Sequence, residues 1–387
     1  EVAARTDASS RFGADHRWGM FWSLGFMWNI KNEAFLKDIE WLTSAQVKLS
    51  TGTSGNSEIP YYDHLALVSG DANYNDEAGI YPSQSGNEEL SWEQTWANNV
   101  GVSFGLYNRV NVNVDFYHKK TTNMLMLVPQ SYAITGVGNR WDNIGAMMNR
   151  GVEIAIDGDV IRTKDFTWNL SANVSYNKNK LLELYNGVEE YVNSTTGLKY
   201  VVGHSVREYF MNRYAGVNPA NGDALWYTAD GELTTEFREE DKVMTGKSFD
   251  SPWVGGFGTS LMWKGLSLSA QFSWMAKRYV MNNDRFFEES NGLYSAYNQS
   301  KRLLYDRWKK PGDITDIPRY GVTAQLDDRF LENSSFLRLK NLTLAYAFPQ
   351  SLLKKTNFFT SARVYLQGQN LLTWTGFTGL DPEVATN

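Results

Sequence analysis

In the stretch 100–119, residues 100–117 alternate between apolar and polar side chains with a period of two, and this alternation is interrupted at Asn108-Arg109. The apolar positions are Val100, Val102, Phe104 and Leu106 before the break, and Val110, Val112, Val114 and Phe116 after it. The residues between them are small or carry hydroxyl, amide or carboxyl groups. Because successive side chains on a strand point to opposite faces, this pattern predicts a tight β-hairpin with one apolar and one polar face.

The same alternation recurs along the chain. It predicts further strands at 1–12, 18–30, 41–51, 152–156, 166–176, 257–263, 266–274, 336–348 and 362–372. Short strands are expected near 209–217 and 224–228. In the stretch 336–348 the alternation slips at Lys340-Asn341, which indicates a β-bulge.

The connections between these strands alternate between short and long. The long ones span 52–98, 121–148, 178–253 and 276–334, and the first two of them are expected to be irregular. Long strands with this alternation are typical of an all-β, antiparallel transmembrane β-barrel with short periplasmic turns and long extracellular loops. A soluble β-sandwich usually has shorter strands. Tryptophans near predicted strand ends suit the two membrane interfaces: Trp18, Trp41, Trp168, Trp263 and Trp274.

Composition narrows the function classes. The 387 residues include no cysteine, which excludes a disulfide scaffold and thiolate metal sites. The net charge of −6 argues against binding to nucleic acid. No apolar run reaches about 18 residues, so no transmembrane helix is expected. Because residue 1 is Glu rather than Met, we expect a mature, processed or partial chain.

Motifs of catalysis and metal binding occur in the wrong context. Ser103 lies in a G-x-S-x-G sequence, but inside a predicted strand. Residues 175–178 read S-x-x-K, but the partner motifs S-D-N and K-T-G are absent. Residues 71–75 begin like a calcium loop, yet Asp76 stands where Gly is needed and Pro82 where Glu is needed. We therefore expect no enzymatic activity, no metal and no cofactor; calcium in this loop is the weaker alternative.

Five stretches, in this order, resemble motifs of SusC/RagA-type TonB-dependent outer-membrane transporters. They are residues 5–13 (RTDASSRFG), 87–95 (NEELSWEQT), 149–153 (NRGVE), 336–344 (FLRLKNLTL), and 368–371 (GQNL) followed by 379–383 (GLDPE). The sequence departs from the family pattern at Ala8, where Gly is usual, and at Trp22, where Pro is usual.

The resemblance implies a 22-stranded barrel, of which 1–387 would be the C-terminal part of one barrel domain, about half of it, without the plug domain and the final strand. It implies TonB-dependent import of an oligosaccharide or peptide across the outer membrane of a Gram-negative, Bacteroidetes-type cell. The implied partners are a SusD-like surface lipoprotein as a lid, outer-membrane lipid, and TonB–ExbB–ExbD through the missing N-terminal region. The alternatives are a siderophore-type TonB-dependent receptor without a lid, and a soluble, surface glycan-binding β-sandwich.

Contacts with cargo or lid are expected from aromatic residues in the long connections, because aromatic side chains are enriched in binding pockets. The candidates are Tyr61, Tyr62, Tyr74, Trp141, Tyr191, Trp226, Tyr227, Tyr294, Tyr297 and Trp308.

Overall fold

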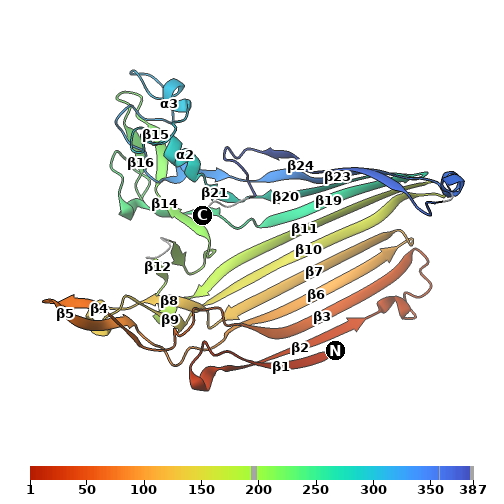
Figure 1. The fold of residues 1–387 in the computed structure, drawn as a ribbon, viewed down its shortest axis with the longest axis horizontal. Coiled ribbons are helices and arrows are strands. Elements are labelled where there is room, and N and C mark those ends of the chain that lie inside the picture. Colours follow the sequence, from red (N-terminus) through yellow and green to blue (C-terminus); the bar gives the residue numbers. More distant parts are fainter. Residues whose placement is uncertain (193–197, 357, 384–387) are drawn as a thin grey trace. The chain divides into compact units, whose positions relative to one another are not determined.

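The computed structural model describes residues 1–192, 198–356 and 358–383. Eleven long strands form one antiparallel sheet in the order β1-β2-β3-β6-β7-β10-β11-β19-β20-β23-β24 (Figure 1). Their bounds are β1 Val2–Ala8, β2 Trp18–Trp28, β3 Leu42–Asn56, β6 Glu93–Leu106, β7 Val110–Thr122, β10 Ala146–Arg162, β11 Phe166–Glu183, β19 Trp253–Trp263, β20 Leu266–Ala276, β23 Phe336–Ala347 and β24 Arg363–Thr375. The predicted antiparallel all-β class is confirmed.

The chain divides into two compact units that share strand β11. The first unit comprises 1–160, 173–192 and 200–206, and the described part of the second comprises 161–172, 198–199, 207–356 and 358–383. Each unit is considered by itself below.

Short strands and helices fill the long connections. The short strands are β4 Leu67–Tyr74, β5 Glu77–Gln84, β8 Leu125–Pro129, β9 Asn139–Asn143, β12 Glu190–Val192, β13 Lys199–Val201, β14 Glu208–Met211, β15 Arg213–Val217, β16 Ala224–Tyr227, β17 Leu233–Thr234, β18 Val243–Ser248, β21 Tyr279–Met281 and β22 Leu331–Asn333. The α-helices are α1 Tyr132–Thr135, α2 Asn283–Glu288, α3 Arg302–Tyr305 and α4 Gln350–Leu353. The 3-10 helices are η1 Ala14–His16, η2 Ile30–Asn32, η3 Tyr185–Gly187, η4 Glu239–Asp241, η5 Asp328–Phe330 and η6 Lys354–Thr356. Within the described ranges, none of the helices combines the length and the apolar character needed to cross a membrane.

The predicted central hairpin is confirmed. Val102 faces Val114 across β6 and β7, and the pairing continues without a shift from Leu106 to Gln94. The turn residues Tyr107 and Asn108 both have positive φ, of 54° each. Two consecutive left-handed residues are what a tight hairpin turn requires, because that geometry matches the twist of the strands.

The predicted phase slip in the last hairpin is confirmed. The register between β20 and β23 shifts between Gln271 and Phe272, and the register between β23 and β24 shifts between Leu339 and Asn341. A bulge adds one unpaired residue to the strand, so the alternation resumes one residue out of phase and the apolar side chains stay on the apolar face.

The prediction of irregular structure over 52–98 and 121–148 is wrong at several places. Strand β3 continues to Asn56 and β6 already begins at Glu93. The hairpins β4–β5 and β8–β9 lie within the two stretches. The last residues of β3, 51–56, are Gly, Ser, Thr or Asn on both faces, and β8 is apolar on both faces, so neither stretch alternates although its backbone pairs.

One face of the sheet is apolar and accessible. In the first unit it carries the row Val47, Val102, Val114 and Ile154, whose members face one another from strand to strand. Phe116 on this face is 56% exposed. In the second unit the rings of Phe257 and Phe272 stack on it with centroids 4.6 Å apart, and Leu366 is 75% exposed. An extended apolar face is what a lipid-facing barrel wall requires.

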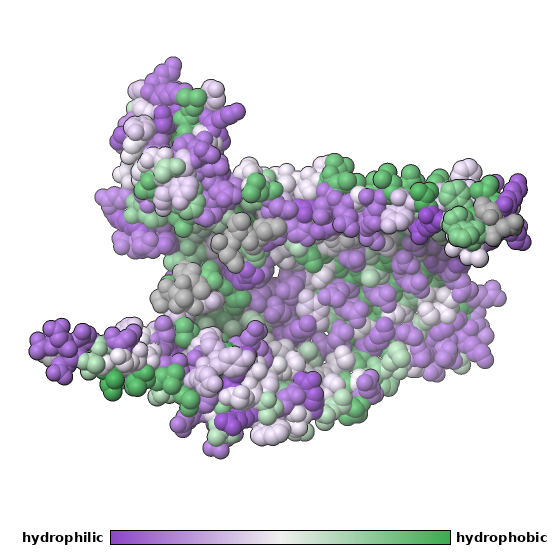
Figure 2. Space-filling model, in the orientation of Figure 1, coloured by the Kyte–Doolittle hydropathy of each residue, from purple (hydrophilic) through white to green (hydrophobic). Residues whose placement is uncertain are grey.

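The opposite face is polar and hydrogen-bonded. In the first unit, Ser103 Oγ donates to Asn113 Oδ1 at 2.7 Å, and Tyr117 Oη donates to Asn177 Oδ1 at 2.9 Å. Asn177 Nδ2 in turn donates to Asn149 Oδ1 at 3.1 Å. Figure 2 shows hydrophobic side chains along β23 and β24 and hydrophilic ones over much of the visible face of β6 and β7.

Candidate functional site

The long connections all leave the sheet at the end opposite its tight turns. The turns lie at 107–109, 163–165 and 264–265, whereas the connections 57–92, 123–145, 184–252 and 277–335 carry the short strands and helices. In a barrel wall the long loops are the extracellular ones. The candidate site is therefore sought in these loops.

In the first unit, a small hydrophobic cluster ties two of these connections, 57–92 and 123–145, to the short connection between β1 and β2. Phe12, Ile59 and Leu90 are buried against one another, and Trp92, Leu125 and Trp141 pack around them. Ser91 N donates to Asn143 Oδ1 at 2.7 Å, and Asn143 Nδ2 donates back to Ser91 O at 2.8 Å. Reciprocal side chain–backbone hydrogen bonds of this kind fix an irregular loop, because they satisfy backbone groups that no strand partner reaches.

A second cluster of the first unit surrounds Tyr191. It buries Leu181, Leu184 and Tyr191. The Tyr191 ring stacks on Tyr200 with centroids 6.1 Å apart, and its hydroxyl donates to Leu127 O at 3.3 Å. Burial raises the pKa of the Tyr191 hydroxyl. Tyr191 therefore contributes to the internal packing of the loop.

In the second unit, the loops form a body around aromatic rings. Phe286 of α2 packs edge-to-face on Phe330 at 5.4 Å and on Tyr294 at 5.9 Å. Phe287 packs on Tyr294 at 4.8 Å and on the largely exposed Tyr297 at 5.6 Å. Tyr297 is thus an exposed ring supported from below by two others.

An ion network, the arginine network, borders this aromatic cluster. It comprises Arg285, Glu289, Arg302, Asp316 and Glu332. Arg302 holds Glu289 through Nη1, at 2.7 and 2.9 Å, and Asp316 through Nη2. Burial alone would raise the pKa of Asp316, but the hydrogen bonds and charge of Arg302 keep this pKa below its usual value. Forked contacts of this kind are among the stronger ion pairs in proteins.

A buried carboxylate anchors the same loop body to β16. Asp327 is fully buried and accepts a hydrogen bond from Trp226 Nε1 at 2.8 Å. Burial raises the pKa of Asp327 against the opposing charge of Arg329, which lies 3.1 Å away. The neighbouring Asp328 accepts from Tyr214 N at 2.8 Å.

The ten aromatic candidates differ widely in exposure. Tyr61, Tyr62 and Tyr297 are 68%, 64% and 60% exposed, and Tyr227 is 36% exposed. Trp141, Tyr294 and Trp308 are half-buried, whereas Tyr191 and Trp226 are buried. Tyr74 belongs to β4, but its side chain lies outside what the structure describes. Two pairs are brought together, Tyr61 with Tyr62 at 6.4 Å and Tyr294 with Tyr297 at 6.2 Å. Contact with cargo or a lid remains a prediction for all ten.

A cavity beside the arginine network was not found by sequence reasoning. It measures about 660 Å³ and lies next to α2, lined by Asn282, Arg285, Glu289, Arg302, Thr378 and Leu380, among others. The sequence offers one indication of this cavity: Arg285 and Glu289 are four residues apart, a spacing that predicts an ion pair on one helix face. The other members come from segments far along the chain.

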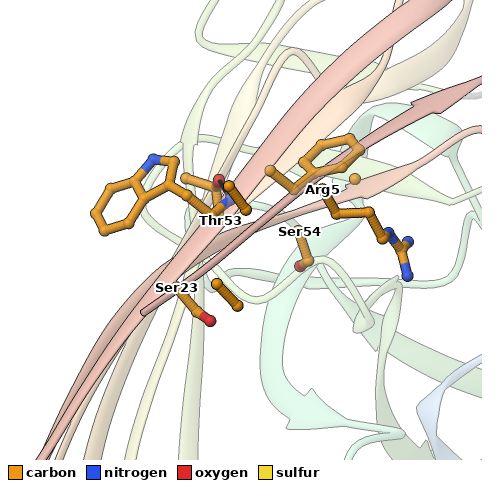
Figure 3. A pocket seen from close by; sticks show the side chains of 9 residues that line it. Arg5, Ser23, Thr53 and Ser54 are labelled. Carbon is orange, nitrogen blue, oxygen red and sulfur yellow. Dashed lines mark hydrogen bonds between the residues drawn. The ribbon is translucent and has the colours of Figure 1, made fainter. Parts of the chain in front are cut away.

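A smaller cavity of about 280 Å³ lies over β1, β2 and β3 in the first unit. Figure 3 shows Arg5 pointing away from the hydroxyls of Ser23 and Thr53. Arg5 pairs instead with its neighbour Asp7 at 2.6 Å. The polar groups do not converge, so this cavity is a groove between strand side chains rather than a candidate site.

The catalytic and calcium motifs lie in regular β-structure. Ser103 sits in the middle of β6, and residues 175–178 lie in β11. Residues 71–75 lead into the turn of the β4–β5 hairpin, where Asn75 and Asp76 have φ of 54° and 63°. Among the described residues, no three His, Asp or Glu side chains group in a way that could hold a metal ion.

Comparison with known proteins gives TonB-dependent receptors both as the matching family and as the similar sequences. The sequence family described as TonB dependent receptor-like, beta-barrel matches residues 1–371. The chain is 30% identical to TonB-dependent receptor P3 of Formosa agariphila over 98% of its own length and 40% of the relative's. It is also 30% identical to TonB-dependent receptor SusC of Bacteroides thetaiotaomicron, over 98% of this chain and 39% of that protein.

Among solved structures, the chain is similar to that of the RagAB peptide transporter. The TM-score is 0.91 with 39% identity, over 99% of this chain and 43% of that one. The RagAB peptide importer in its "open-open" state gives the same TM-score and identity. The chain thus spans about two fifths of the length of the relatives that it matches.

Proposed function

Because the chain belongs to the TonB-dependent receptor-like β-barrel family, we propose that it forms part of the wall and the outer loops of a nutrient importer in the outer membrane of a Bacteroidetes-type, Gram-negative bacterium. The observation that carries this proposal is the structural match to the RagAB peptide transporter over 99% of the chain. The apolar, accessible face of the sheet supports a lipid-facing wall. The sandwich alternative does not explain a single sheet with this face.

For the cargo, we propose a peptide. The solved structures that match at 39% identity are named as a peptide transporter and a peptide importer. An oligosaccharide is the second candidate, because the paired tyrosines Tyr61 with Tyr62, and Tyr294 with Tyr297, offer ring faces on which sugars stack.

The partners follow from the same proposal. A SusD-like lipoprotein would cap the outer loops, and TonB–ExbB–ExbD would act through a part of the protein that this chain does not span. Energy has to be imported because the outer membrane holds neither nucleotide nor an ion gradient. This chain would supply binding surface and wall, and we propose no catalytic step for it.

The proposal is tested in cells that produce the full-length protein with an affinity tag. Fluorescent peptides from a protein digest, labelled malto-oligosaccharides and an iron–siderophore chelate serve as probes. We expect uptake of the peptides to disappear on deletion of the gene and on addition of a protonophore, and a lipoprotein to co-purify with the tagged protein. Peptide uptake that persists after deletion refutes the proposal. Chelate uptake without a lipoprotein supports the siderophore receptor instead.

Tyr297 offers a test at the level of one side chain. A ring contact contributes about 0.5–1.5 kcal/mol beyond its buried area, so Tyr297→Ala should weaken cargo binding about fivefold. Tyr305→Ala is the matched control, since Tyr305 is 70% exposed in the same loop body and has no ring partner among the described residues. Equal effects of the two substitutions contradict a role for Tyr297 in contact with cargo.

A further inference from the structure

The residues that follow β24 leave the sheet and fold back against it. This segment, Thr378–Glu383, is called the clasp here. Its two carboxylates meet two cations of β23. Arg338 donates through Nη2 to Asp381 and through Nη1 to Glu383 at 2.9 Å, and Lys340 Nζ donates to Glu383 at 2.8 Å. Two positive and two negative side chains therefore balance on the polar face of the strand.

A third cation holds the backbone of the clasp. Arg278 Nη1 donates to Pro382 O at 2.6 Å and to Glu383 O at 3.1 Å. Arg278 is buried, and its guanidinium lies over the ring of Phe249 at 4.6 Å. A buried guanidinium that donates to two carbonyls fixes the position of both, because leaving its donors unpaired would be costly.

The other end of the clasp is tied to the loop body of the second unit. Thr378 donates to Glu332 through its backbone N at 2.8 Å and through Oγ1 at 2.8 Å. Asn282 Nδ2 donates to Thr378 Oγ1 at 3.0 Å. Glu332 belongs to the arginine network through Arg285, at 3.1 Å. The clasp thus connects that network to the wall strand β23.

The clasp also closes a cavity. Thr378 and Leu380 form one wall of the cavity of about 660 Å³ beside α2, whose remaining wall includes Arg285 and Arg302. Displacement of the clasp would therefore open this cavity on one side and remove the contacts of Thr378 with Asn282 and Glu332.

We propose that the clasp is an electrostatic strap that couples the outer loops of the second unit to the polar face of its wall and sets access to the cavity beside α2. Where the clasp meets β23, the Arg338 side chain is 7% exposed, whereas those of Lys340, Asp381 and Glu383 are 35%, 37% and 31% exposed. Arg338 is therefore the buried centre of this contact, and Lys340 and the two carboxylates form its partly exposed rim. The strap is a property of the fold and does not depend on the identity of the cargo.

Hydrogen exchange measured by mass spectrometry on the full-length protein in detergent tests the strap. The double variant Asp381→Asn/Glu383→Gln removes both charges with little change of shape. We expect its backbone amides to exchange at least tenfold faster in 279–288 and 376–383, with no change in the wall strands 253–276. Unchanged protection of 279–288 overturns the proposal.

Two further variants separate the strap from a general loss of stability. Glu236→Gln removes an exposed ion pair, with Arg238, in the same loop body and should leave 279–288 unchanged. Lys340→Met keeps both Arg338 contacts and should accelerate exchange in the same segments, but less than the double variant. Equal acceleration in 253–276, or an equal effect of Glu236→Gln, also overturns the proposal.

Discussion

The assignment of the apolar face to lipid predicts opposite outcomes for the same substitution at two adjacent residues. Ile154 lies on the apolar face of β10, opposite Val114, and Ala155 lies on the polar face, opposite Asn113. Arginine at Ile154 must reside in hydrocarbon. Arginine at Ala155 lies between Glu153 and Asp157 on the same face of the strand, where its charge finds carboxylates.

The loss of stability expected for Ile154→Arg depends on how deep residue 154 lies in the apolar band. The polar residue Arg150 lies four positions along β10 on the same face, which is about 13 Å at 3.3–3.4 Å per residue. In the other direction the next charged residue on this face is Arg162, eight positions away or about 27 Å, so Ile154 lies inside the apolar band between the two arginines. An arginine at the bilayer midplane of a barrel costs about 2–4 kcal/mol, which lowers the folding equilibrium constant about 30- to 700-fold. For Ala155→Arg we expect a change of less than about 1 kcal/mol.

The assay is guanidinium unfolding of the full-length protein in lipid vesicles, followed by tryptophan fluorescence. Folding into detergent micelles checks that both variants can form the native sheet. If Ala155→Arg costs as much as Ile154→Arg, or more, the assignment of the two faces is refuted.

Three further predictions concern single positions. Gly265 has a φ of +90°, and a Cβ there would lie 2.6 Å from a carbonyl oxygen of the facing strand, so Gly265→Ala should destabilise the protein by about 1–3 kcal/mol in the same titration. Burial raises the pKa of Asp327, so the contribution of this carboxyl group to stability falls as the pH rises from its pKa in the unfolded chain to its pKa in the folded protein. Asp327→Asn should abolish this pH dependence, measured by backbone hydrogen exchange after correction for the intrinsic pH dependence of the exchange reaction. The hydrogen bond from Arg338 lowers the pKa of Asp381, so the clasp should be held above pH about 4 and released in stronger acid. A spin label at Leu380→Cys, in a chain without native cysteine, should gain mobility at that transition.

The strands with an apolar face are predictable because a sheet with one apolar and one polar face imposes period two on each strand. The alternation around Val102 and Val114 is a local property, and it correctly predicted the central hairpin. The extension of β3 to Asn56 was missed because no such constraint acts where both faces meet water or other loops. The five resembling stretches, spread over the chain, led to a family that the comparisons confirm.

The candidate site shows the limit of sequence reasoning more clearly. Choosing aromatic residues in long connections does not separate Tyr297, which is 60% exposed, from Trp226, which is 4% exposed. Burial depends on what packs against a ring, and for Trp226 that includes Asp327, 101 residues away. The membership of 1–387 in one barrel domain, and the contacts with cargo, remain predictions.

The sequence by itself determined most of the long strands, their two faces, the bulge near Lys340 and the resemblance to a transporter family, because each of these depends on neighbours along the chain. Only the tertiary structure decided which charges meet. Arg338 finds Asp381 and Glu383 more than 40 residues later, and Arg302 joins Glu289 to Asp316. Such pairs depend on how the loops return to the sheet. That path is set by packing between segments that carry no common local pattern.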